Sequence, residues 1–223
     1  MKSFFVTGVD TGVGKTVFTC ALAHTLHSSG IDVGIMKPFA TGLSRTGQYK
    51  SEDVELLIKY SGVSDPQQLV NPYFFEIPAS PYMAAKKLGK TINIDTVLSS
   101  FERLESIHDV VIVEGIGGIM TPILKDYFVA DLIKDLHLDS ILVTSTKIGS
   151  VNHALLSIDA CKKYGIRITG LVINEADSGY DVNDLESDLV SLSGVDVICK
   201  IPHVSDIESA SKVLQQNNFL SKL

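Results

Sequence analysis

The sequence predicts a three-layer, doubly wound α/β fold, in which a mostly parallel sheet is covered by helices on both faces. Short apolar runs alternate with amphipathic stretches from one end of the 223 residues to the other, as expected when strands and crossover helices alternate. Residues 110–113 form a continuous β-branched run, which is typical of a strand buried on both faces. Hydrophobic residues make up 45% of the chain, enough for a large core.

The first part of the chain shows clear start and stop signals. Apolar residues recur at helical spacing after Lys15, and Ser29 and Gly30 end that helix. Pro38 prevents the second strand from continuing as a central strand. We therefore expect strands at 4–7 and 31–36, helices at 15–28 and 52–60, and a polar loop at 40–51.

Residues 66–82 are rich in proline, but Tyr73, Phe75 and Tyr82 give this stretch apolar anchors. We expect an ordered, irregular segment there. A glycine-rich loop is predicted at 114–118, directly after the 110–113 strand. The remaining predicted elements are helices at 81–88, 94–106, 150–164, 181–192 and 205–217, and strands at 140–144, 168–173 and 195–201. We find no repeat or domain boundary and expect one domain over residues 1–223.

Composition excludes several classes of function. The formal net charge is −7 and the pI is about 5.3, which argues against general electrostatic binding of nucleic acid. Cys20, Cys161 and Cys199 have no metal-ligand or CxxC spacing, so we expect buried thiols in a reducing compartment. No apolar run reaches membrane-spanning length, and the first residues enter a predicted strand without a signal-peptide pattern. We expect a cytoplasmic protein without a membrane partner.

A phosphate-binding motif joins the first strand to the first helix. Gly8, Gly12 and Gly14 precede Lys15 and Thr16, and glycines let backbone N–H groups converge on a phosphate at a helix N-terminus. Lys15 would lie near the β- and γ-phosphates, and Thr16 would ligate Mg²⁺. These features predict a P-loop NTPase-like fold that binds a nucleoside triphosphate. Five residues separate Gly8 from Gly14 instead of four, so either Gly8 is not the first loop glycine or the loop is one residue longer.

Three charged residues lie at the same predicted edge of the sheet, where ligands bind. Lys37 follows the second strand and is either a solvated edge charge or an anion-binding group. Asp53 either caps a helix or ligates Mg²⁺. Glu114 follows the most apolar strand, and a charge there is costly unless it is paired or bound to a metal. We favour Glu114 as a second metal carboxylate.

Asn174 ends another predicted strand. It is either a simple turn residue or the reader of a purine edge, because an amide offers a paired donor and acceptor. The six histidines are dispersed along the sequence. We therefore do not expect a histidine nucleophile or a histidine metal cluster.

Taken together, the motifs resemble those of the dethiobiotin synthetase family, and the resemblance covers nearly the whole chain. It depends on residues 8–16, 37–38, 41–42, 53, 71–73, 78, 80–81, 113–118, 147–149, 152–153 and 172–174. The family resemblance implies a homodimeric ligase of biotin synthesis. Such an enzyme converts 7,8-diaminopelargonate, CO₂ and ATP to dethiobiotin, ADP and phosphate, through a carbamate and a carbamic–phosphoric anhydride.

The resemblance also implies roles for individual residues. Catalysis would involve Lys37, Lys15 and Thr11, and Mg²⁺ would be held by Thr16, Asp53 and Glu114. The implied nucleotide-binding residues are Gly12, Val13, Gly14, Lys15, Thr16, Val17, Asp53, Glu114, Gly115, Ile116, Gly117, Asn174, Glu175, Pro202, His203 and Val204. The implied substrate-binding residues are Thr11, Lys37 and Thr41, together with Gly149, Ser150, Val151 and Asn152 from the partner subunit. Many family members carry an acidic residue in place of Gly12, serine in place of Thr41 and aspartate in place of Glu175.

Two other classes of P-loop protein compete with this interpretation. An amidoligase of the cobyrinic-acid diamide type usually carries an appended glutaminase domain, for which 223 residues leave no room. A ParA-like partitioning ATPase typically places a second lysine near the start of the P-loop, and residues 8–13 contain none. The acidic pI also disfavours the DNA contact that such a switch needs.

Overall fold

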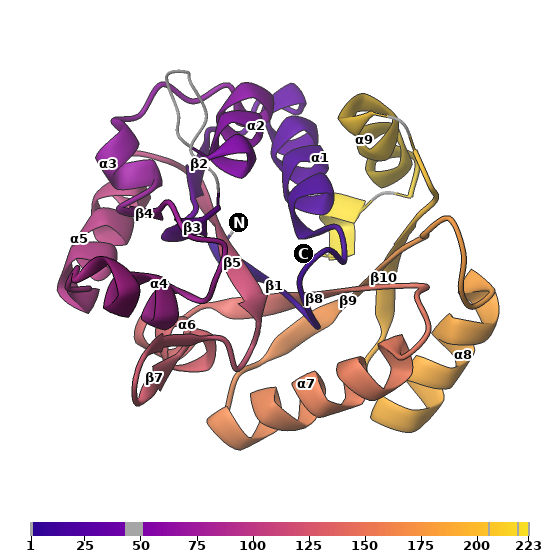
Figure 1. Cartoon of the computed structure of the whole chain (residues 1–223). Coiled ribbons are helices and arrows are strands. Elements are labelled where there is room, and N and C mark those ends of the chain that lie inside the picture. Colours follow the sequence, from indigo (N-terminus) through magenta and orange to yellow (C-terminus); the bar gives the residue numbers. More distant parts are fainter. Residues whose placement is uncertain (1, 43–50, 205, 218, 223) are drawn as a thin grey trace.

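The computed structural model describes residues 2–42, 51–204, 206–217 and 219–222. A six-stranded sheet in the order β10-β9-β8-β1-β5-β2 crosses the molecule (Figure 1). Every neighbouring pair in this sheet is parallel. The strands are β1 (Phe4–Gly8), β2 (Val33–Met36), β5 (Val110–Gly118), β8 (Asp139–Ser145), β9 (Ile168–Asn174) and β10 (Val197–Ile201).

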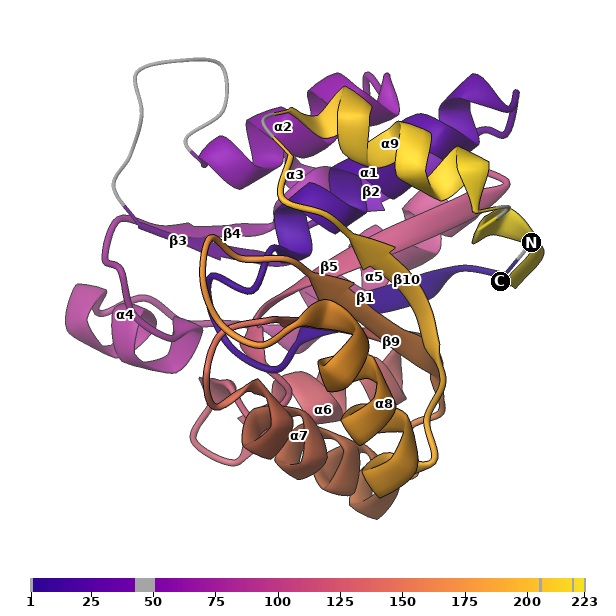
Figure 2. The same cartoon turned by 90° about the vertical axis from the view of Figure 1, so that its right-hand side faces the viewer.

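Helices cover both faces of this sheet, so the predicted three-layer arrangement is confirmed (Figure 2). Side chains alternate along each strand: Phe4 and Val6 pack with the helices of one face, whereas Phe5 packs with those of the other. One face is covered by α1 (Lys15–Ser28), α2 (Glu52–Ser61) and α9 (Ile207–Gln216), with the 3₁₀ turn Phe219–Lys222 beside them. The other face is covered by α5 (Ile94–Glu105), α6 (Val129–Asp135), α7 (Ser150–Tyr164) and α8 (Val182–Ser193).

The proline-rich segment is ordered around an aromatic stack. The Tyr73 ring is stacked with those of Phe39 and Phe75, with ring centroids 5.4 and 6.1 Å apart. Strands β3 (Phe39–Thr41) and β4 (Tyr73–Phe75) pair in parallel around this stack. The short helices α3 (Gln67–Val70) and α4 (Pro81–Leu88) flank β4.

The prediction of a glycine-rich loop at 114–118 is wrong, because these residues continue strand β5. Gly118 pairs with Gly8, and a Cβ on Gly115 would lie 2.7 Å from the Phe5 ring. Glycine is needed here for close strand packing. Helix α6 and the hairpin formed by β6 (Pro122–Leu124) and β7 (Tyr127–Phe128) were not predicted from the sequence.

The other predicted elements occur with small shifts of their ends, as is usual for sequence-based boundaries. The expected loop at 40–51 begins with the end of β3, and residues 43–50 of that prediction lie outside the described residues. The three cysteines are buried free thiols, and burial raises the pKa of Cys161 to about 11. Among the described residues, no helix has the length and apolar character needed to cross a bilayer.

Candidate active site

The loop between β1 and α1 has the geometry of a phosphate cradle. Gly12 and Gly14 adopt positive φ angles of 71° and 86°, which glycine reaches without steric cost. The Lys15 ammonium donates a hydrogen bond to the Asp10 carbonyl oxygen at 2.8 Å. Gly8 is the last residue of β1, and a Cβ there would lie 2.9 Å from the Lys15 Nζ. The long spacing therefore reflects an exposed arch at residues 10–12 that begins after the strand.

Lys15 is an unusual lysine because its side chain is largely buried. Burial, followed by repulsion from the nearby Lys37 ammonium, lowers the pKa of Lys15 to about 8. A phosphate group bound in the loop would favour the charged form, since an opposite charge raises the pKa of an amine. The loop is thus electrostatically suited to an anionic ligand.

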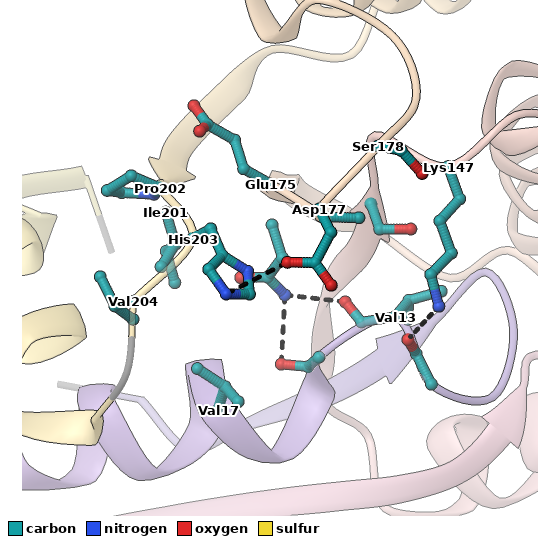
Figure 3. A pocket seen from close by; sticks show the side chains of 15 residues that line it. Val13, Val17, Lys147, Glu175, Asp177, Ser178, Ile201, Pro202, His203 and Val204 are labelled. Atoms are coloured by element: carbon teal, nitrogen blue, oxygen red, sulfur yellow. Dashed lines mark hydrogen bonds and ion pairs between the residues drawn. The ribbon is translucent and has the colours of Figure 1, made fainter.

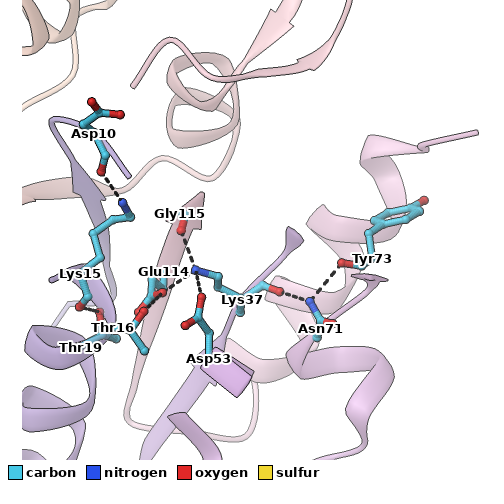
Figure 4. Close-up of polar contacts among 10 residues, drawn as sticks. All are labelled: Asp10, Lys15, Thr16, Thr19, Lys37, Asp53, Asn71, Tyr73, Glu114 and Gly115. Atoms are coloured by element: carbon cyan, nitrogen blue, oxygen red, sulfur yellow. Dashed lines mark hydrogen bonds and ion pairs between the residues drawn. The ribbon is translucent and has the colours of Figure 1, made fainter. Parts of the chain in front are cut away.

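Lys37 and Glu114 form a buried ion pair next to this loop (Figure 4). The Lys37 Nζ lies 2.5 Å from the Glu114 Oε1, 3.0 Å from the Gly115 carbonyl oxygen and 3.4 Å from Asp53 Oδ2. The Thr16 hydroxyl donates to the same Glu114 Oε1 at 3.0 Å. Of the two interpretations of Lys37, the solvated edge charge is wrong: the residue is only 3% exposed.

The charges of this cluster depend on one another. Burial disfavours the charged form of Lys37, but the carboxylates of Glu114 and Asp53 outweigh it and raise the pKa of Lys37. Glu114 is fully buried, so its negative charge needs the compensation that Lys37 supplies.

The residues predicted to hold Mg²⁺ fit such an ion. The second carboxylate oxygen of Glu114, Oε2, is buried and makes no hydrogen bond within the described residues. Asp53 lies beside the Lys37 ammonium and the Thr16 hydroxyl beside Glu114, and both add hard oxygen atoms (Figure 4). Mg²⁺ prefers oxygen ligands and usually takes one or two carboxylates plus water and phosphate.

A cavity of about 760 Å³ opens beside this cluster. Its polar side carries five residues that were assigned to substrate or metal from the sequence: Thr11, Thr16, Lys37, Thr41 and Asp53. Its other lining residues include Pro78, Ala79, Ser80, Ile116, Gly117, Thr121 and Pro122. A polar end joined to a largely apolar wall suits a ligand with a polar head and an aliphatic chain.

A second cavity of about 340 Å³ also borders the P-loop (Figure 3). The two cavities share Gly12, Gly14 and Val17, so a single elongated ligand can occupy both along the loop. The residues predicted from sequence that line the second cavity are Gly12, Val13, Gly14, Val17, Asn174, Glu175, Pro202, His203 and Val204.

Asn174 connects this second cavity to the P-loop. Its Nδ2 donates to the carbonyl oxygens of Val13 and Gly14, at 2.8 and 3.1 Å. Its Oδ1 is buried and has no hydrogen-bond partner among the described residues. The predicted contact with a purine edge needs both the donor and the acceptor of this amide, but the donor is already hydrogen-bonded. Only the acceptor remains for a ligand.

Several lining residues were not predicted. Lys147 donates to the Gly12 carbonyl oxygen at 3.4 Å, and Asp177 pairs with His203 at 3.3 Å across the mouth of the second cavity (Figure 3). Lys147 belongs to the 147–149 motif on which the family resemblance depends, and it follows the C-terminal end of β8. Both the motif and this position at the ligand edge of a parallel sheet were available signals. The others are Ser145, Ala176, Ser178 and Ile201, which have no motif of their own.

The structure does not bring every predicted residue to these cavities. Gly149, Ser150, Val151 and Asn152 form the start of helix α7 and line neither of the two cavities described above. Gly115 contributes its carbonyl oxygen to Lys37 from within β5.

Solved structures with the same fold include a ParA family ATPase from Chlorobium tepidum TLS. It has a TM-score of 0.56 and 19% sequence identity, with 100% of this chain and 96% of that chain covered. The MinC:MinD cell division protein complex of Aquifex aeolicus gives a TM-score of 0.57 at 15% identity, covering 98% and 89% of the two chains. At these identities the similarity concerns the fold alone.

Sequence relatives are much closer. The family model described as an AAA domain matches residues 2–211. The ATP-dependent dethiobiotin synthetase BioD of Nitrosopumilus maritimus (strain SCM1) is 49% identical, with 100% of this chain and 99% of the relative covered. The protein of the same name from Bacillus licheniformis is 38% identical over 92% of this chain and 88% of the relative. With its P-loop, its buried Lys37–Glu114 pair and these full-length matches, the chain belongs to the ATP-dependent dethiobiotin synthetase family.

Proposed function

We propose that this chain is an ATP- and Mg²⁺-dependent cyclo-ligase that converts 7,8-diaminopelargonate and CO₂ to dethiobiotin, with release of ADP and phosphate. The observation that supports this most strongly is the position of Lys37. Its ammonium lies at the junction of the P-loop, two carboxylates and the larger cavity. The 49% identity to a dethiobiotin synthetase over the full chain supports the same substrates.

The proposed reaction has three steps. One amine of the substrate adds to CO₂ and loses a proton, which gives a carbamate. A carbamate oxygen then attacks the γ-phosphorus of ATP, so that ADP leaves and a carbamic–phosphoric anhydride forms. The second amine attacks the carbonyl carbon and displaces phosphate, which closes the five-membered ureido ring.

Lysine charges support these steps. Lys15 would bind the phosphates, and Lys37 would hold the carbamate next to the transferring phosphoryl group. Both ammonium groups are largely buried, where electrostatic interactions with a developing negative charge are stronger than in water. Thr16, Asp53 and Glu114 would hold Mg²⁺, which when bound supplies further neutralisation of phosphate charge.

We place the diamine in the larger cavity. Thr11 and Thr41 line its polar end, and the apolar residues 78–79 and 122 line the part that would hold the aliphatic chain. The loop at 149–152 of a partner subunit would bind the substrate carboxylate. Ile148 and Leu156 are 76% and 62% exposed beside this loop, and such exposed apolar side chains support a homodimer contact.

The nucleotide base would occupy the smaller cavity. Its lining by Val17, Pro202 and Val204 suits a flat apolar ring. The free Oδ1 of Asn174 would accept a hydrogen bond from the exocyclic amino group of adenine. The three buried free thiols support a reducing, cytoplasmic location.

A coupled assay tests the function directly. The protein is incubated with ATP, Mg²⁺, bicarbonate and the diamine, and phosphate is measured while the product is identified by mass spectrometry. We expect phosphate release to require both bicarbonate and the diamine. The amount of phosphate released should equal the amount of ureido product formed. Phosphate release that is unchanged when the diamine is omitted would contradict the proposal.

A further inference from the structure

The side chain of Asn71 is bound to the backbone of Lys37 (Figure 4). Asn71 Nδ2 donates to the Lys37 carbonyl oxygen at 2.6 Å and to the Tyr73 carbonyl oxygen at 3.2 Å. The backbone N–H of Lys37 donates to the Val70 carbonyl oxygen at 2.7 Å. Two consecutive residues, Val70 and Asn71, therefore satisfy both backbone polar groups of Lys37.

These hydrogen bonds hold the backbone of Lys37 at a position where the six-stranded sheet does not. Strand β2 ends at Met36 and lies at the edge of the six-stranded sheet. Pro38 follows Lys37 and has no N–H to donate. Asn71 is 7% exposed and Lys37 is 3% exposed, so water has little access to this carbonyl and an unmade hydrogen bond there would be costly.

The ammonium of Lys37 needs such support because a lysine side chain is flexible. Its Nζ has to lie among three oxygen atoms, those of Glu114, Gly115 and Asp53. A displacement of the Lys37 backbone would be transmitted to the ammonium, and misplacement of a catalytic group by about 1 Å lowers rates about 100-fold.

We propose that Asn71 is a positioning residue for Lys37: its amide fixes the Lys37 carbonyl and thereby places the ammonium between the two carboxylates. The kinetic part of this inference rests on the proposed function, in which Lys37 holds the reacting carbamate. The geometric part does not.

The first test observes the ammonium itself. Proton-detected ¹⁵N spectra resolve lysine ammonium groups that are buried and hydrogen-bonded, and the Lys37 signal is assigned by its absence in Lys37→Met. Asn71→Leu and Asn71→Asp keep the size of the side chain but remove the amide donor. Asn71→Ser keeps a hydroxyl donor. The matched control is Asn93→Leu, because Asn93 is an exposed asparagine that caps α5 and does not contact Lys37.

We expect the Lys37 signal to shift or broaden beyond detection in Asn71→Leu and Asn71→Asp, less in Asn71→Ser, and not at all in Asn93→Leu. An unchanged Lys37 signal in a folded Asn71→Leu or Asn71→Asp protein would overturn the inference. This measurement requires no turnover. If the unaltered protein lacked diamine-dependent activity, the proposed function would be wrong. The spectrum would still show whether Asn71 positions the Lys37 ammonium.

The second test is a double-mutant cycle. Asn71→Leu should lower kcat at least tenfold, while the Kd for ADP changes less than threefold. In a Lys37→Met background the same substitution should change kcat less than twofold, because the group that it positions is already gone. Equal losses in both backgrounds would show that Asn71 acts on the fold in general and would contradict the inference.

Discussion

The Lys37 ammonium lies 2.5 Å from Glu114 Oε1 although the two residues are 77 positions apart in the sequence. Strands β2 and β5 are parallel neighbours in which Met36 pairs with Val113, so the next residue of each strand reaches the same edge of the sheet. Both side chains are buried. The register of the sheet therefore brings the two residues together, and substitution of either one should alter the environment of the other.

Replacing Lys37 by methionine should abolish most activity and weaken the fold. The methionine keeps the apolar stem but leaves Glu114 as an uncompensated buried charge, which costs about 3–5 kcal/mol of the free energy of unfolding. We expect turnover to fall at least about 10²-fold. Steady-state kinetics and urea unfolding measure both effects. The control is Lys59→Met, which removes a surface lysine over the Tyr60 ring. If Lys37→Met turned over at a rate close to that of the unaltered protein, Lys37 would have no role in catalysis.

Glu114→Gln should raise the Mg²⁺ requirement of the reaction. The substitution keeps the shape of the side chain and one oxygen but removes the negative charge, and we expect the Mg²⁺ concentration for half-maximal rate to rise at least about tenfold. A Mg²⁺ titration at saturating ATP checks this. Glu175→Gln alters a glutamate of the smaller cavity instead and should leave the titration unchanged; the assignment of Glu114 fails if the two variants behave alike.

Gly14→Ala should be more harmful than Gly12→Ala, although both glycines have positive φ. Either substitution costs about 1 kcal/mol of backbone strain. A Cβ on Gly14 would also lie 2.4 Å from the Asn174 Nδ2, whereas a Cβ on Gly12 would have nothing within 4 Å. We therefore expect Gly14→Ala to weaken ADP binding at least tenfold and Gly12→Ala less than threefold in calorimetric titrations. Equal effects would mean that the Asn174 contact does not shape the loop.

His108 should make stability depend on pH. Its two ring nitrogens lie 2.9 Å from carboxylate oxygens of Asp32 and Asp65, and a Cβ on Gly34 would lie 2.6 Å from the ring. Burial disfavours the imidazolium, but the hydrogen bonds to Asp32 and Asp65 outweigh it and raise the pKa of His108 above 6.5. Protonated His108 therefore stabilises the fold. This contribution is complete at pH values below the unfolded-state pKa and is lost as the pH rises through the folded-state pKa.

The check is urea unfolding of the unaltered protein and of His108→Gln between pH 6 and pH 9. We expect the difference in unfolding free energy to be largest at pH 6 and to shrink toward pH 9. His137→Gln, at an exposed histidine with positive φ, should show no such trend. A difference between the unaltered protein and His108→Gln that stays constant over this range would contradict the role of the imidazolium.

Local patterns made most of the fold predictable. The P-loop, helix α1 and the apolar strand at residues 110–113 each depend on neighbouring residues, so periodicity and glycine placement were sufficient. Helix α6 and the β6–β7 hairpin were missed because they are short and depend on packing against distant elements: α6 contacts β5 and α7, and the hairpin contacts α4 and α6.

Contacts between distant residues account for what the sequence did not predict in the site. Lys37, Asp53 and Glu114 were assigned one by one from their places at strand and helix ends, yet their mutual pairing depends on sheet register. The hydrogen bond from Asn71 to the Lys37 carbonyl spans 34 positions. The orientation of the Asn174 amide depends on two P-loop carbonyl oxygens 160 and 161 positions away.

The fate of the bicarbonate oxygen tests the central claim most directly. If a carbamate oxygen attacks the γ-phosphorus, that oxygen leaves with the phosphate when the ring closes. Turnover with freshly added ¹⁸O-labelled bicarbonate should therefore yield inorganic phosphate carrying one ¹⁸O, measured by mass spectrometry before the label exchanges with water. Unlabelled phosphate formed alongside the ureido product would contradict the account.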